Sequence, residues 1–60
     1  MTDAERLSKL RHDLANPLSA ILAETQLLLM DPQILPAEAI RALKEIESLA
    51  IRMRSLLRST

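Results

Sequence analysis

The sixty-residue chain contains no cysteine, no glycine and no aromatic residue. Without cysteine, disulfides and zinc sites built on thiolates are excluded, and a single histidine cannot form a multi-histidine metal site. Without glycine, the usual phosphate-cradling loop is absent. Without aromatic rings, nucleic-acid bases have no platform on which to stack. These absences remove most of the common metal, nucleotide and nucleic-acid sites.

Charge and hydropathy exclude further classes of protein. Eight basic and eight acidic residues give a formal net charge of zero, which argues against a nucleic-acid partner. The apolar runs are far shorter than the roughly 20 residues that span a bilayer. The first ten residues also lack the apolar segment of a signal peptide. We therefore expect no direct membrane insertion and a cytoplasmic location, with a membrane anchor elsewhere in a parent protein left open.

What the chain does have is a large apolar share, with 48% hydrophobic residues. A chain this short buries only about 60% of the surface that its unfolded form exposes. Small scaffolds are therefore usually stabilised by disulfides, a metal or a partner chain. Because the first two are excluded or unsupported here, oligomerisation is the expected source of stability.

The residues that favour helices dominate the chain, and one segment interrupts them. Pro32 and Pro36 bracket this segment: Pro32 disfavours helix in the residue before it, and Pro36 suits the first turn of a new helix. The sequence predicts one domain with a first helix over about 3–31, a joint over 32–35 and a second helix over about 36–58. A joint this short makes the helices antiparallel neighbours.

Apolar residues recur along both helices at helical spacing. In the first helix they form a single stripe: Leu7, Leu10, Leu14, Leu18, Ile21, Thr25 and Leu28. The second helix has a broader face: Ala39, Ala42, Leu43, Ile46, Leu49, Ala50, Met53, Leu56 and Leu57. A face that wide contacts more than one neighbour, and a lone hairpin supplies only one. We therefore predict an all-α antiparallel hairpin that homodimerises into a four-helix bundle; packing against the rest of a larger protein is the alternative.

The segment RHDLANPL, residues 11–18, places the only histidine beside an acid and shortly before a proline. At 100° per residue His12 lies about 165° from the centre of the stripe, so it should face outward. Asp13 is placed to orient the imidazole through Nδ1. Pro17 removes the hydrogen bond to the Asp13 carbonyl, at a cost of about 3 kcal/mol, and should bend the helix. From these residues alone, a reactive histidine and an incidental surface histidine are equally open.

The longer stretch HDLANPLSAI resembles the H-box of sensor histidine kinases. The dimerisation and histidine phosphotransfer domain of that family is a helical hairpin that dimerises, so the resemblance covers the whole chain. It implies that His12 accepts the γ-phosphoryl group of ATP on Nε2, and that Asp13 orients the ring and assists proton removal. It implies that Asn16 contacts nucleotide phosphate or positions a water, and that Pro17 supplies a bend between signalling states.

The resemblance also implies partners. Ser19, Leu22 and Gln26 would form a docking surface for the receiver domain of a response regulator. The ATP-binding domain of the family is glycine-rich and is absent from this chain, so no cofactor is expected here, and ATP and Mg²⁺ would act through a separate domain. The expected function is therefore that of a phospho-acceptor and dimerisation domain, inactive as a kinase alone. A non-catalytic dimerising hairpin and a histidine phosphotransfer protein that relays between regulators are the alternatives.

Overall fold

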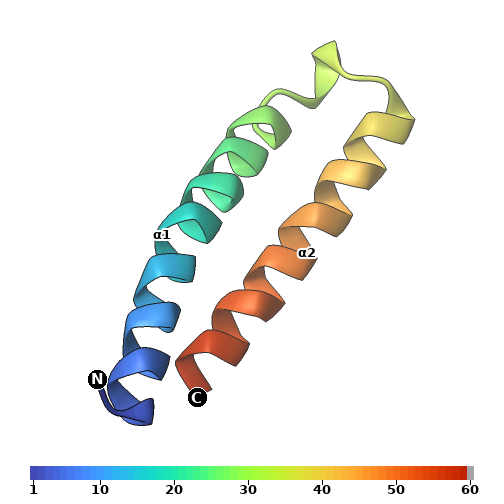
Figure 1. Ribbon diagram of the computed structural model, residues 1–60. Helices are drawn as coiled ribbons and strands as arrows, with labels where there is room; N and C mark the ends of the chain where they lie inside the picture. The colour runs from blue at the N-terminus through green and yellow to red at the C-terminus, as the bar shows by residue number, and fades with distance from the viewer. Residues whose placement is uncertain (60) are drawn as a thin grey trace.

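The computed structural model describes residues 1–59, which form two long helices joined by a short turn (Figure 1). Helix α1 spans Asp3–Leu29, a 3-10 turn, η1, spans Pro32–Ile34, and helix α2 spans Ala37–Ser59. The helices run antiparallel, so both chain ends lie at the same end of the hairpin. The all-α hairpin that the sequence predicts is confirmed, although α1 ends at Leu29 rather than near residue 31.

Local chemistry explains where α1 begins and ends. The Glu5 backbone N–H donates to Thr2 Oγ1 at 3.1 Å, and the Thr2 N–H donates to Glu5 Oε1 at 3.4 Å. This reciprocal capping box satisfies two N–H groups that a helix start leaves unpaired. At the other end, Pro32 disfavours helical backbone in the residue before it. Asp31 accordingly has φ −127° and ψ 71°, and the helix has stopped.

The core of the hairpin is small. Leu18 and Leu22 of α1 pack with Ala50 of α2, and the partly buried Leu57 extends this cluster. Thr25 is buried as well, and its hydroxyl donates to the Ile21 carbonyl at 2.7 Å, so the buried oxygen is satisfied. So few buried apolar side chains give a hairpin only modest stability on its own.

Both helices leave large apolar side chains exposed. Apart from Leu27 of α1 and Ile51 of α2, they are Leu7, Leu10, Leu14, Ile21 and Leu28 of α1 and Ile46, Leu49, Met53 and Leu56 of α2. On each helix these positions are rotated by roughly 20–120° from the buried Leu18 or Ala50, in the same sense when viewed from the helix N-terminus. Because the helices are antiparallel, equal senses place both sets on one side of the hairpin. We call this set the apolar face.

The hairpin is a thin rod rather than a globule. Its principal extents are 49 × 14 × 12 Å and its radius of gyration is 14.6 Å. A compact globular domain of this length has a radius of gyration of about 10 Å. Each helix therefore has only the other helix as a neighbour, and the apolar face has no cover within the described chain.

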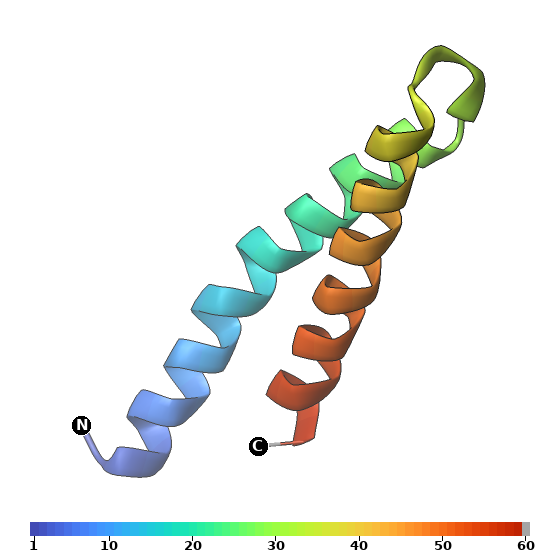
Figure 2. The same ribbon diagram turned by 90° about the vertical axis from the view of Figure 1, so that its right-hand side faces the viewer.

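Helix α1 continues through Pro17 without ending. Proline has no N–H for the Asp13 carbonyl, and its ring crowds that carbonyl, which bends a helix. Figure 2 shows α1 changing direction near its middle, in the part of the helix that contains Pro17.

Candidate functional site

His12 lies on the exposed surface of α1 with Asp13 beside it. The imidazole is 76% exposed, and its Nδ1 lies 3.7 Å from Asp13 Oδ1. This distance is longer than a hydrogen bond, so the pair makes an electrostatic contact only. Because Asp13 contacts the Nδ1 edge of the ring, Nε2 is on the opposite edge. The outward orientation that the sequence predicts is therefore present, and the carboxylate is on the side where it can orient the ring.

The second oxygen of Asp13 has its own contact. Lys9 Nζ lies 3.9 Å from Asp13 Oδ2, one turn back along α1. Both side chains are well exposed, so this pair stabilises the helix by only a few tenths of a kcal/mol. The ammonium group of Lys9 and the imidazole of His12 thus contact different oxygens of the Asp13 carboxylate.

His12 points away from the apolar face. At 100° per residue, His12 lies roughly 160–180° from Leu10, Ile21 and Leu28 around the axis of α1. A partner that covers the apolar face therefore leaves His12 open to a second partner. Asn16 lies one turn beyond His12 on the same side of α1 and is also exposed.

A groove runs beside His12, between the N-terminal half of α1 and the C-terminal half of α2. Its volume is about 360 Å³, enough to admit a phosphoryl group. The lining residues are Ser8, Arg11, His12, Ala15 and Ser19 of α1 and Arg54, Leu57 and Arg58 of α2. Three arginines and no acidic residue line the groove, so it is cationic although the whole chain has no net charge.

The structure separates the three residues that the resemblance assigns to a docking surface. Ser19 and Gln26 are exposed, and Ser19 lines the groove beside His12. Leu22 is only 5% exposed and packs with Leu18 and Ala50. Leu22 is one helical turn from Leu18 and shares its face, so the structure places it in the core rather than on the surface that docking requires.

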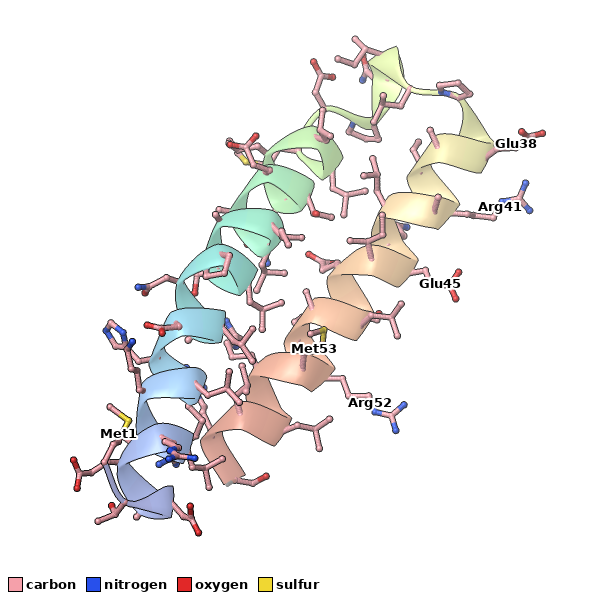
Figure 3. All side chains as sticks on the ribbon, viewed as in Figure 1. Met1, Glu38, Arg41, Glu45, Arg52 and Met53 are labelled. Carbon is pink, nitrogen blue, oxygen red and sulfur yellow. The ribbon has the colours of Figure 1, made fainter. Side chains whose placement is uncertain are left out.

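The sequence patterns do not identify the two arginines that α2 contributes to the groove. Arg54 is half-buried and Arg58 lies one turn later. Both follow Ala50 at steps of four, and Ala50 faces α1. The spacing can be read from the sequence, but only the structure shows that Ala50, and with it this side of α2, faces α1. By contrast, Figure 3 shows Arg52 pointing away from α1, on the same outer side of α2 as Arg41.

Two further classes of site have no support in residues 1–59. No cluster of three or more histidine, cysteine, aspartate or glutamate side chains is placed to hold a metal ion there. Within the same residues, neither helix combines the length and apolar character needed to cross a membrane.

The fold and the site together define a class of protein. An antiparallel helical hairpin with an exposed histidine–aspartate pair on its first helix, opposite an apolar face, is the arrangement of a histidine phospho-acceptor domain. The chain belongs to the His Kinase A (phospho-acceptor) domain family, whose model matches residues 3–60. No curated protein and no solved structure matches the chain. The family to which the H-box resemblance points is therefore confirmed.

Proposed function

We propose that this chain is the dimerisation and phospho-acceptor domain of a two-component sensor histidine kinase. His12 receives the γ-phosphoryl group of ATP from a separate catalytic domain and passes it to an aspartate in the receiver domain of a response regulator. The observation that carries this proposal is the exposed imidazole with Asp13 at its Nδ1 edge, which leaves Nε2 facing outward.

In this reaction the lone pair of His12 Nε2 attacks the γ-phosphorus. A bond forms between Nε2 and phosphorus, the bond from phosphorus to the β–γ bridging oxygen breaks, and ADP leaves. Positive charge develops on the ring, and the Asp13 carboxylate stabilises it and assists removal of the Nδ1 proton to solvent. ATP and Mg²⁺, held by the separate domain, supply the phosphoryl group and neutralise its charge.

The neighbouring residues have supporting roles in the proposal. Asn16 is exposed one turn from His12, where its amide can contact the nucleotide phosphate or position a water molecule. Ser19 and Gln26 remain in the docking surface for the receiver domain, and Leu22 does not. Pro17 lies where α1 bends, and it allows the segment that carries His12 to move relative to α2 between signalling states.

A second copy of the chain covers the apolar face in this proposal. The exposed side chains of that face come from both helices, so two hairpins related by a two-fold axis would form a four-helix bundle. In such a dimer the two His12 side chains lie on the outer surface. There each remains accessible to a catalytic domain and to a receiver domain.

Phosphoryl transfer with labelled ATP tests the proposal. The chain is mixed with the ATP-binding domain of its cognate kinase, Mg²⁺ and γ-labelled ATP. We expect label that acid removes and base does not on the wild type, slower labelling of Asp13→Asn, and none on His12→Gln. Circular dichroism of each variant checks that the hairpin still forms.

The rival functions give different results in the same system. Label that reaches His12 only from a phosphorylated receiver domain, and never from ATP, would identify a relay protein instead. Absence of label by either route would leave a non-catalytic dimerising hairpin. Equal labelling of the wild type and His12→Gln would contradict His12 as the acceptor.

A further inference from the structure

The cationic groove has a feature that the phospho-acceptor function does not itself require. Arg54 and Arg58 of α2 line the same groove as His12 of α1, although they are more than forty residues away in the sequence. Arg11 also lines it but already makes an interaction within the chain. The two α2 arginines are therefore the groups to consider as partners for an anion bound at His12.

The ligand that fits this groove is the phosphoryl group on His12 itself. A phosphoryl group carries about −1.5 to −2 charges near neutral pH and presents three acceptor oxygens. Guanidinium groups match those oxygens through paired N–H donors, and charge-assisted hydrogen bonds of this kind are the stronger ones. Arg54 is half-buried, so water screens its charge less than that of a fully exposed arginine.

We infer that Arg54 and Arg58 form a phosphoryl-binding subsite that holds the phosphorylated side chain of His12 against α2. This inference rests on the proposed function, because it concerns the phosphorylated state of the same histidine. It assigns α2 a role beyond dimerisation. The arginines of one helix stabilise the phosphoryl group carried by the other, so a change in the spacing of α1 and α2 changes how firmly that group is held.

The subsite is tested on chemically phosphorylated protein, so that no kinase domain is needed. Potassium phosphoramidate phosphorylates exposed histidine: its N–P bond breaks, a bond from phosphorus to the imidazole nitrogen forms, and the ring proton leaves with ammonia as ammonium. ³¹P NMR then follows the second ionisation of the phosphoryl group on the full chain. The variants are Arg54→Gln with Arg58→Gln, the charge-conserving Arg54→Lys with Arg58→Lys, and Arg52→Gln as a single-charge control.

We expect the double glutamine variant to raise the midpoint of this ionisation by about half a pH unit or more, since nearby cations favour the dianion. The lysine variant should restore part of the difference. Arg52→Gln removes one positive charge, half of the change in the double glutamine variant, from the outer side of α2 and should leave the midpoint unchanged. Circular dichroism shows whether each variant retains its helices.

Two results would overturn the subsite. One is an equal midpoint in the wild type and the double glutamine variant. The other is a shift in Arg52→Gln about half the size of that in the double glutamine variant, which would reduce the effect to net charge. Either leaves the proposed function intact, because His12 would still carry the phosphoryl group. Failure of phosphoramidate to label the wild type, by contrast, would count against His12 as an acceptor and would overturn both proposals.

Discussion

Replacement of Ile21 by alanine should weaken the dimer without weakening the hairpin. Ile21 lies on the apolar face and is 51% exposed, so about half of its surface is left for a second copy to cover. Full burial of such a side chain contributes about 1.5–3 kcal/mol, so dimerisation gains about 1 kcal/mol from each copy of Ile21. Because a two-fold dimer contains two copies of Ile21, Ile21→Ala should reduce the free energy of dimerisation by about 2 kcal/mol in total. That loss raises the dissociation constant about 30-fold.

Leu27 supplies the matched control. It is 61% exposed, an aliphatic residue of equal size on the same helix, but lies about 120° around the axis from Ile21. Leu27→Ala should therefore leave the dissociation constant within about threefold of the wild-type value. Sedimentation equilibrium over a range of concentrations measures both. Equal weakening in the two variants, or a wild type that stays monomeric at micromolar concentration, would refute the assignment of the apolar face to a second copy.

Three further predictions concern the stability of the fold, each measured at one fixed protein concentration. Leu22→Ala should lower the free energy of unfolding by about 2–4 kcal/mol in urea titrations, because Leu22 is in the core; a loss below 0.5 kcal/mol would contradict that position. Thr2→Ala removes the capping box and should cost about 1 kcal/mol, whereas an unchanged urea midpoint would show that the cap contributes nothing. Pro17→Ala should straighten α1 and raise the melting temperature, gaining at most about 3 kcal/mol, and a lower melting temperature would argue against strain at the bend.

The hairpin and the exposure of His12 could be predicted because both depend on local rules. Pro32 disfavours helical backbone in the residue before it, and a single helical wheel is enough to place His12 opposite most of the leucines. The wheel is less informative about which apolar residues face which neighbour. It assigns Leu18 and Ile21 to one stripe, whereas the structure buries the first against α2 and leaves the second exposed. Leu22 lies at the edge of that stripe, and only the packing against α2 decides that it is buried.

The groove could not be predicted because it depends on how α2 is rotated about its own axis relative to α1. That rotation is set by the backbone of the joint, where Asp31 leaves the helical region and η1 follows.

Competition between local contacts also limits prediction. The spacing of Glu5 and Lys9 suits an ion pair, but Glu5 accepts the capping bonds of Thr2 and Lys9 contacts Asp13. Which of several nearby donors a carboxylate contacts depends on the local geometry, and the spacing of residues in the sequence does not reveal that geometry.

The position of the phosphoryl group on the ring of His12 decides whether this histidine is the acceptor and whether it reacts through Nε2. After phosphorylation by the catalytic domain and ATP, a ¹H–³¹P correlation spectrum distinguishes the two ring nitrogens. Because Asp13 contacts the Nδ1 edge, the phosphoryl group should be on Nε2. A phosphoryl group on Nδ1, or on a serine hydroxyl of the chain, would contradict the account.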